Sequence, residues 1–333
     1  MNYNYNKDTT YHYSFIRLMT GHDLSVRRIP LMGIENKKEG PVIVLTACMH
    51  GDEIGGTVVI QELFKILRKK LVKGKVYAFP MLNPFGFENT SRRISISNED
   101  LNRSFPGNNK GTLAQRIAFH IMSKIKDINP AVVLDLHNDW NKSIPYVVID
   151  SLPEPDKPEN LYRLAKICNL PAIQEPESIM TSLSYCLNQN KIPALTLELG
   201  ESLIINEKNV MYGINAVLNI LYDMGIVKDP SSILAYNMPE LARNKILTYS
   251  SSPLCSSSGI IRFSKKPGDI VRKGDRIAKV YNAFGKLNET ITSVHNGIIL
   301  GHNDYAVAYP GSPVMAFGVI ETVQKSVSSI KDK

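Results

Sequence analysis

Four short motifs carry residues that together could hydrolyse an amide. They are His50-Gly-Asp-Glu53, Asp100-Leu-Asn-Arg103, Asp135-Leu-His137 and the single residue Glu198. Two histidines and a glutamate can bind zinc and leave one coordination position open for water. A further glutamate can act as the base, and arginines can hold the negative charge of substrate and transition state. The sequence offers no comparable set elsewhere, so we expect metal-assisted hydrolysis.

The first motif follows a predicted buried strand. Residues 41–47 form a continuous apolar run with β-branched residues, which is typical of a strand inside an α/β sheet. Apolar residues at helical spacing follow between positions 59 and 67. The motif therefore lies where a strand gives way to a helix. Ligands of open α/β sheets bind at this carboxyl end of the strands.

Strands and helices continue to alternate along the chain. We expect strands over 75–80, 131–134, 146–149 and 194–197, and helices over 113–125, 159–168 and 207–222, the last with Asn206 as its N-cap. The strand over 131–134 delivers Asp135 and His137, whose spacing places both side chains on one face if the strand persists. The strand over 194–197 delivers Glu198. Three catalytic candidates thus emerge at the same kind of position.

The candidate ligands differ in how strongly the sequence supports them. His50 and Glu53 are three residues apart, so one turn could aim both at a metal, but this pair alone is a weak signal. His137 adds a third ligand from a neighbouring strand. Glu198 ends a buried-strand sequence, where an ionised group needs a partner or a chemical role. We interpret Glu198 as the residue that takes the proton of the water; the alternative is a paired surface carboxylate.

Two polar loops supply arginines. Arg92 and Arg93 follow the loop at 83–87, and Asn102 and Arg103 lie in the next loop. A rigid guanidinium fork suits a substrate carboxylate or a developing oxyanion. Without the metal motif, these arginines would be interpreted as solvated loop residues.

The composition is ordinary for a soluble globular protein, with 43% hydrophobic and 21% charged residues among 333. The first residues lack the basic and apolar regions of a signal peptide, and no apolar run approaches the ~20 residues of a membrane span. Four scattered cysteines form neither a zinc-ribbon nor a disulfide pattern. We therefore expect a cytoplasmic protein with no membrane partner.

The formal net charge of +8 raises the question of a nucleic-acid partner. The densest basic run, between Lys65 and Lys75, lies at the end of a predicted helix, where cations suit the helix dipole and a solvated face. The run has no interleaved aromatic residues and matches no nucleic-acid motif. We expect no nucleic-acid partner, and the charge would instead favour anionic small substrates by steering.

The order of the motifs resembles one known family. HGDE, NPFGF followed by an arginine, DLNRSFPG, DLH and LELG occur in the order seen in the succinylglutamate desuccinylase/aspartoacylase group, a branch of the zinc carboxypeptidase-like hydrolases. The resemblance spans about residues 35–225, and the DLNR-FPG element makes it more specific than the first motif alone. It implies a mixed central sheet flanked by helices, over residues 1–245.

The resemblance also implies roles for individual residues. It makes His50, Glu53 and His137 the ligands of one zinc ion, and Glu198 the general base and acid. Arg92 matches the arginine that polarises the scissile carbonyl, with Arg93 as its neighbouring competitor. Asn102 and Arg103 match the pair that grips a substrate carboxylate. Asp100 matches an acceptor that orients the first histidine, and Asp135 is a candidate for similar work beside its neighbour, His137.

The carboxyl-terminal part has a different character. Short strands punctuated by turns predict a small all-β unit over 246–325, followed by a tail at 326–333. This unit resembles the β-rich carboxyl-terminal domain of the same family, which is similar to biotinyl/lipoyl barrel-sandwich modules. A carrier module would need a lysine in an MKM or DKA hairpin, whereas this chain has Ala283-Phe-Gly-Lys286. We therefore interpret the unit as structural.

Three functions fit this reading of the sequence. The first is a zinc-dependent deacylase acting on an N-acyl amino acid or related small N-acyl amine, with a carboxylate on the substrate. The second is a metallocarboxypeptidase acting on peptides, and the third is a non-catalytic binding protein of the same fold. The acyl group and the amine stay undecided, a homo-oligomer is left open, and imidazole and carboxylate ligands would also accept cobalt or manganese.

Overall fold

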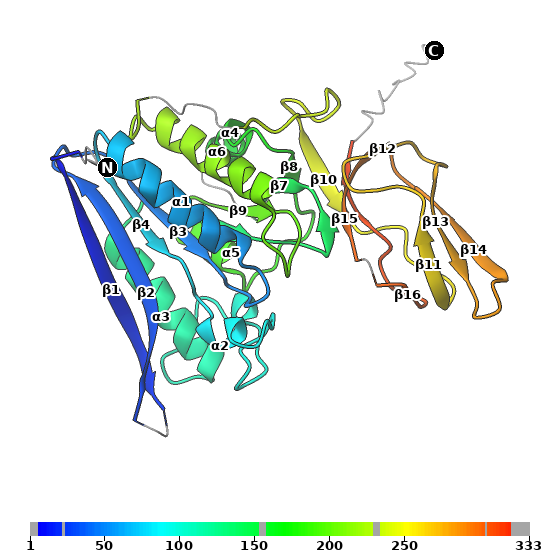
Figure 1. Ribbon diagram of the computed structural model, residues 1–333, viewed down its shortest axis with the longest axis horizontal. Helices are drawn as coiled ribbons and strands as arrows, with labels where there is room; N and C mark the ends of the chain where they lie inside the picture. The colour runs from blue at the N-terminus through cyan, green and yellow to red at the C-terminus, as the bar shows by residue number, and fades with distance from the viewer. Residues whose placement is uncertain (1–5, 22–23, 153–157, 229–233, 304, 321–333) are drawn as a thin grey trace, which may run out of the picture.

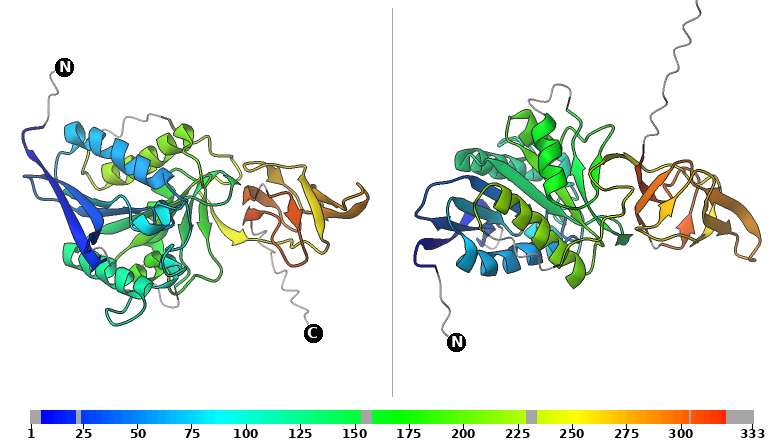
Figure 2. Two further views of the ribbon diagram at one scale, coloured as in Figure 1. Left: turned by 60° about the horizontal axis from the view of Figure 1, so that its bottom comes forward. Right: turned by 90° about the horizontal axis from the view of Figure 1, so that it is seen from above.

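The computed structural model describes residues 6–21, 24–152, 158–228, 234–303 and 305–320. One large mixed sheet with helices on both faces forms most of the molecule, and a smaller antiparallel sheet lies at one end (Figures 1 and 2). This arrangement confirms the predicted fold class.

The elements agree with the predicted alternation of strands and helices. The helices are α1 (Gly55–Lys70), α2 (Pro84–Phe87), the 3-10 turn η1 (Leu101–Arg103), α3 (Leu113–Ile128), α4 (Pro158–Ile167), α5 (Leu183–Gln189) and α6 (Glu207–Asp223). The strands of the amino-terminal two thirds are β1 (Thr9–Thr20), β2 (Val26–Asn36), β3 (Val42–Ala47), β4 (Lys75–Phe79), β5 (Val132–His137), β6 (Lys142–Ser143), β7 (Pro145–Ile149), β8 (Ala172–Gln174) and β9 (Ala194–Leu199). Asn206 caps α6 as predicted, because its side chain accepts from the backbone N–H groups of Lys208 and Asn209.

The central strands of the large sheet set the position of the site. Its order is β1-β2-β4-β3-β5-β9-β7-β8 and then the carboxyl-terminal strands β10-β17-β15-β12. Strands β4, β3, β5 and β9 are parallel, whereas β7 runs antiparallel to β9. The carboxyl ends of β3, β5 and β9 therefore meet at one edge, and the first residues of β7 lie beside them.

Alternating side chains on the central strands serve two separate cores. Leu134 and Leu136 of β5 pack with Leu195 and Leu197 of β9 in the core beneath α1, α4 and α6. Val133 belongs to the other core, beneath α3 and α5. His137 lies on the Val133 face, because successive residues of a strand point to opposite sides. Figure 1 shows α1 and α6 on one side of the sheet and α3 on the other.

The carboxyl-terminal strands form a further core. They are β10 (Ile246–Ser250), β11 (Gly259–Phe263), β12 (Ile270–Val271), β13 (Arg276–Tyr281), β14 (Leu287–Thr292), β15 (Gly297–His302), β16 (Val307–Ala308) and β17 (Ala316–Val319). β14, β13, β11 and β16 make the small sheet, which packs on β15 and β17 through residues such as Ile277 and Phe317. Lys286 lies exposed in the turn between β13 and β14.

The division of the chain into 1–245 and 246–325 stays a prediction. β10 begins at Ile246 but pairs in parallel with β8, so hydrogen bonding of the large sheet crosses the proposed boundary. Residues 321–325 and the predicted tail at 326–333 lie outside the described residues.

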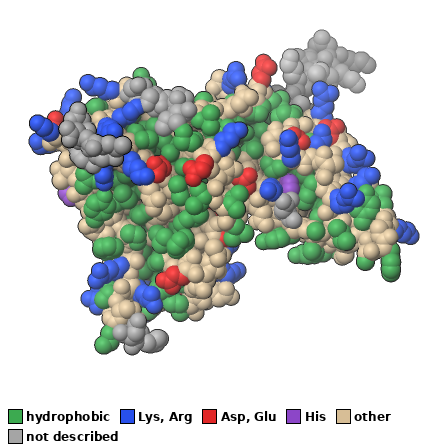
Figure 3. Space-filling model, viewed as in Figure 1, with side chains coloured by type: hydrophobic (Ala, Val, Ile, Leu, Met, Phe, Trp, Pro, Cys, Tyr) green, Lys and Arg blue, Asp and Glu red, His purple; other side chains and the backbone are tan. Residues whose placement is uncertain are grey.

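The helices and the basic side chains of the surface concern two predictions, that the protein has no membrane partner and no nucleic-acid partner. No helix within the described residues is long and apolar enough to cross a membrane. The last turn of α1 carries Arg68, Lys69 and Lys70, where a helix end was predicted. Figure 3 shows Lys and Arg side chains spread over the face of the molecule that is also seen in Figure 1. The absence of a nucleic-acid partner stays a prediction.

Candidate metal centre and active site

The two histidines reach the same place from neighbouring strands. β3 and β5 pair in parallel with Ala47 opposite Leu136, so the turn after β3 and the last residue of β5 lie side by side. The turn containing His50 is held tightly against the loop at 83–91. The Gly51 N–H donates to the Ser91 carbonyl over 2.9 Å, and a Cβ on Gly51 would lie 1.9 Å from the Gly86 backbone. Only glycine fits at this position.

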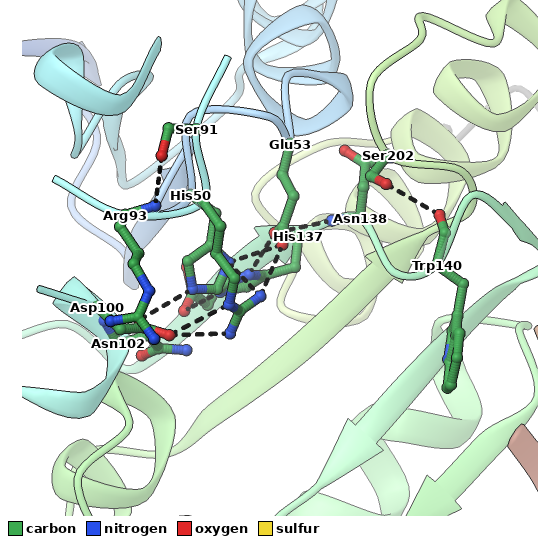
Figure 4. A network of polar contacts seen from close by, with 12 residues as sticks. His50, Glu53, Ser91, Arg93, Asp100, Asn102, His137, Asn138, Trp140 and Ser202 are labelled. Atoms are coloured by element: carbon green, nitrogen blue, oxygen red, sulfur yellow. Dashed lines mark hydrogen bonds and ion pairs between the residues drawn. The ribbon is translucent and has the colours of Figure 1, made fainter. Parts of the chain in front are cut away.

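Three buried side chains converge in this turn. His50 Nδ1 lies 2.7 Å from Glu53 Oε1, and His137 Nδ1 lies 2.8 Å from Glu53 Oε2. One ligand atom from each of the three residues lies within 4.8 Å of the other two. Figure 4 shows the three side chains pointing toward one another. The structure therefore brings together the residues that the sequence predicts as ligands.

The outward ring nitrogens of both histidines face carboxylates. His50 Nε2–H donates to Asp100 Oδ1 over 3.2 Å, and His137 Nε2–H donates to Asp135 Oδ2 over 2.9 Å. Thr46 Oγ1–H holds Asp135 in turn, over 2.6 Å. With the protons on Nε2, each Nδ1 lone pair is free to bind a cation, and the carboxylates make the rings more basic. Asp135 thus occupies the place beside His137 that Asp100 occupies beside His50.

Replacing Asp135 by Asn tests this arrangement. Asn keeps the volume of the side chain but removes the charge that orients His137, so we expect the affinity for a divalent metal ion, measured with zinc, to fall by about 10–100-fold. Competition with a chromogenic zinc chelator measures the affinity. The matched control is Asp127→Asn, which changes an exposed residue of α3. Unchanged affinity in Asp135→Asn would contradict the orienting role.

The electrostatics of the group favour a bound cation. Burial opposes the charge on Glu53, but His50 and His137 outweigh it and hold the pKa of Glu53 well below its usual range. Burial likewise opposes the charge on His137, yet Asp135 and Glu53 raise the pKa of His137 well above its ordinary value. The buried carboxylates of Glu53 and Asp135 are thus stabilised by positive charge between them. A divalent metal can supply that charge, leaving both imidazoles neutral.

Glu198 stands beside the histidines on the same face of the sheet. It lies opposite His137 in the register of β5 and β9, and opposite Tyr146 on the other side. Its Oε2 is buried and has no hydrogen-bond partner among the described residues. Burial, and then the nearby Asp139, raises the pKa of Glu198 well above its ordinary value. A buried acceptor without a partner is unusual, and it suits a proton-transfer group awaiting its substrate.

The two neighbouring arginines are separated by the structure. Arg92 contacts the metal-ligand group, since its Nη1 lies 3.4 Å from Glu53 Oε1 and its Nη2 lies 3.1 Å from Asp100 Oδ2. Arg93 instead donates to the backbone carbonyl of Asn98 over 2.8 Å. Arg92, and not Arg93, therefore lies where a developing oxyanion could be held.

Asn102 and Arg103 belong to the 3-10 turn that begins after Asp100. Asn102 Oδ1 accepts from the Leu183 N–H over 2.9 Å, which fixes the orientation of the amide. Arg103 is exposed, and its Nη1 donates to the Asn102 carbonyl over 3.0 Å. Both residues line the same cavity as His50 and His137.

This cavity has a volume of about 350 Å³, at the small end of the range for ligand sites. Besides the predicted residues, its walls include side chains that the sequence did not single out: Asn138, Asp139, Tyr146, Asp150, Glu175 and Tyr249. Tyr146 on β7 and Asp150 just after it are four residues apart, and their common place in the cavity can be recognised only once the partner and direction of that strand are known. A larger hollow of about 840 Å³ beside the carboxyl-terminal strands is lined largely by apolar and aromatic residues.

Sequence comparison finds one family model and a named relative that match most of the catalytic part of the chain. A sequence model described as the succinylglutamate desuccinylase/aspartoacylase catalytic domain matches residues 39–223. A related protein from Halomonas elongata, named N-alpha-acetyl-L-2,4-diaminobutyric acid deacetylase, is 28% identical over 289 residues. The alignment covers 81% of this chain and 80% of that protein.

Solved structures share the whole fold. The ectoine utilization protein EutE (DoeB) from Ruegeria pomeroyi, in its product-bound form, matches with a TM-score of 0.81 and 22% identity, over 96% of this chain and 98% of that one. A succinylglutamate desuccinylase/aspartoacylase from Rhodobacter sphaeroides matches with a TM-score of 0.79 and 20% identity, over 95% of this chain and 98% of that one. The likeness includes the carboxyl-terminal β unit.

Proposed function

Because this chain belongs to the succinylglutamate desuccinylase/aspartoacylase family, we propose that it is a zinc-dependent deacylase that hydrolyses the amide bond of an N-acyl amino acid. The observation that carries the proposal is the convergence of His50, Glu53 and His137 beside Glu198, whose Oε2 has no hydrogen-bond partner in the part of the chain that the structure describes. The Halomonas elongata relative, which is named for the deacetylation of an N-acetyl diamino acid, supports the choice of substrate class.

The residues present fit a zinc ion. Two imidazole nitrogens and one carboxylate make a three-ligand set of the kind that catalytic zinc sites use, with one position left over. Both imidazoles are fixed from behind by carboxylates, as is usual for zinc-bound histidines. A bound divalent cation would lower the pKa of a water molecule and polarise the scissile carbonyl.

The other residues have separate tasks in the proposed reaction. Glu198 accepts a proton from the attacking water and returns it to the nitrogen of the departing amine. Arg92 stabilises the negative charge that develops on the carbonyl oxygen. Asn102 and Arg103 bind the carboxylate of the amino acid, which fixes the amide relative to Glu198. The cavity of about 350 Å³ suits a molecule of this size.

A substrate screen tests the proposal. The full chain, supplied with zinc, is incubated with N-acetyl amino acids, N-succinyl amino acids and dipeptides, and the released amine is measured. We expect release from one N-acyl amino acid class and none from dipeptides. Release from dipeptides alone would favour a metallocarboxypeptidase, and no release from any compound would favour a binding protein.

We also propose a cytoplasmic location. All four cysteines, Cys48, Cys168, Cys186 and Cys255, are buried and unpaired, as is usual where thiols are kept reduced.

A further inference from the structure

One end of the active-site cavity is acidic and includes a tyrosine. Asp150, just after β7, and Glu175, just after β8, lie at this end. β10 pairs in parallel with β8, with Thr248 opposite Gln174, so the next residues, Tyr249 and Glu175, stand side by side and both line the cavity. β8 and β10 are the second and third strands beyond β9 in the sheet, so this end lies away from the metal ligands.

Tyr249 comes from a different part of the chain than the rest of the cavity. The other described residues that line the cavity range from His50 to Glu198. Tyr249 instead belongs to β10, the first strand of the predicted carboxyl-terminal unit, and lies outside residues 39–223 that the family model matches. The carboxyl-terminal part of the chain thus contributes a side chain to the active-site cavity.

The sheet fixes the position of Tyr249. β10 lies between β8 and β17, and Tyr249 is opposite Gly318 of β17. The side chain packs against the core that contains Tyr146 and Leu247. Residues carried by a strand hold a ligand more precisely than residues on a loop. Tyr249 can therefore present its hydroxyl to the cavity at a constant position.

The hydroxyl of Tyr249 has no hydrogen-bond partner in the part of the chain that the structure describes. The hydroxyl of Tyr146, by contrast, donates to Asp139 Oδ2. Burial, and then the charge of Asp139, raises the pKa of Tyr249 well above its ordinary value, so its hydroxyl keeps its proton near neutral pH. A tyrosine that is largely covered by protein usually pairs its hydroxyl. A bound ligand would supply the partner that the protein does not.

The proposed binding of the substrate places its side chain near this hydroxyl. The scissile carbonyl belongs beside the metal ligands and Arg92, and the α-carboxylate belongs at Asn102 and Arg103. The charge of Arg103 attracts Glu175, so the α-carboxylate would be held on the side of the cavity where Tyr249 lies. The side chain of the amino acid starts from the same carbon as the α-carboxylate, and it is then the part nearest to Tyr249.

We propose that the Tyr249 hydroxyl forms a hydrogen bond with a polar group on the side chain of the substrate amino acid, so that the carboxyl-terminal unit takes part in selecting the substrate. The inference rests on the proposed deacylase function and adds a substrate-binding residue to it. A phenol hydroxyl both donates and accepts a hydrogen bond, so it can pair with an uncharged amide. The unit that the sequence interprets as structural thereby gains a place in the active site.

Replacing Tyr249 by Phe tests the hydrogen bond, because this change removes the hydroxyl and keeps the packed ring. N-Acyl asparagine is compared with N-acyl leucine, and N-acyl glutamine with N-acyl homoleucine, each with the acyl group that the screen selects. Within each pair the side chains have nearly the same shape, but only one carries an amide. In at least one pair, we expect the ratio of kcat/KM for the polar member to that for the apolar member to fall by about 3–10-fold in Tyr249→Phe, the effect of one neutral hydrogen bond.

The matched control is Tyr222→Phe, which removes a half-exposed hydroxyl on α6 and should leave both ratios unchanged. All measurements use the zinc-loaded full chain. Each ratio compares two substrates on one preparation of protein, so it does not depend on how much of a variant is folded. Unchanged ratios for both pairs in Tyr249→Phe, including an equal loss of activity toward polar and apolar substrates, would overturn the proposal while leaving the deacylase intact.

If no N-acyl amino acid is hydrolysed, the proposed function fails and a binding measurement decides the role of Tyr249 separately. The zinc-loaded wild-type and Tyr249→Phe proteins are then titrated calorimetrically with the four free amino acids. The ratio of affinities for the polar and the apolar member should fall in the variant as described for kcat/KM. An unchanged ratio in both pairs, or no binding of any of the four, would reject the proposal as well.

Discussion

Replacing Glu198 by Gln is expected to reduce kcat by about 10²–10⁴-fold, the usual contribution of a positioned proton-transfer group. The amide of Gln has nearly the size of the carboxylate but cannot take a proton from water near neutral pH. Glu198 lies opposite His137 in the strand register, so the group stands next to the proposed metal without being one of its three ligands. Zinc should therefore stay bound while turnover is lost.

The measurement combines steady-state kinetics on the best substrate of the screen with elemental analysis of the same sample. Glu88→Gln, which changes an exposed residue after α2, should behave as the wild-type protein does in both assays. Near-full activity of Glu198→Gln would reject its catalytic role. Loss of zinc from that variant would instead make Glu198 part of the metal site.

Much of the site could be predicted because the ends of buried strands are visible in sequence. The apolar runs before His50, His137 and Glu198 end within three residues of these side chains, which the structure places at one edge of the sheet. Neighbouring parallel strands have their carboxyl ends at the same edge. Residues that follow these strands in sequence are therefore expected to lie close together in the fold. The roles of the residues are still proposals, but their meeting place follows from the strand pattern.

The acidic end of the cavity could not be predicted in this way. Asp150 and Glu175 also follow apolar strands, yet β7 runs antiparallel to β9 and places Val148 opposite Thr196. Asp150 therefore lies toward the start of β9 and away from the edge where Glu198 stands. An apolar run predicts a strand but not the direction in which it runs in the sheet. The position of Asp150 could therefore be assigned only after the pairing of β7 with β9 was known.

The same reasoning explains where the fold prediction fell short. The hairpin of β1 and β2 was not predicted, because most of β1 is exposed and shows no apolar run. The pairing of β10 with β8, which extends the large sheet into the carboxyl-terminal unit, is a contact between distant segments. The predicted strands and helices at 113–222 were placed to within a few residues, since the helices show one apolar face and the strands are short, mostly buried apolar runs.

Replacing His137 by Ala is expected to remove stoichiometric zinc and with it the activity. The change deletes one of three proposed ligands, so affinity should fall by more than the ~10–100-fold typical of residues that only orient a ligand. It also leaves Asp135, 1% exposed, and Glu53, 4% exposed, without the imidazole that lies between them. Buried carboxylates that lose a charged partner are destabilising, so the variant should unfold at a lower temperature.

Metal content after dialysis and thermal unfolding with and without added zinc measure the two effects. A ligand that binds only the folded state raises its stability, so zinc should raise the Tm of the wild-type protein and not that of the variant. His137→Gln, which keeps a polar group in place, separates ligand loss from misfolding, and His120→Ala on α3 should retain zinc. Full zinc occupancy in both His137 variants would overturn this ligand assignment, because two remaining donors cannot enclose the ion as three do.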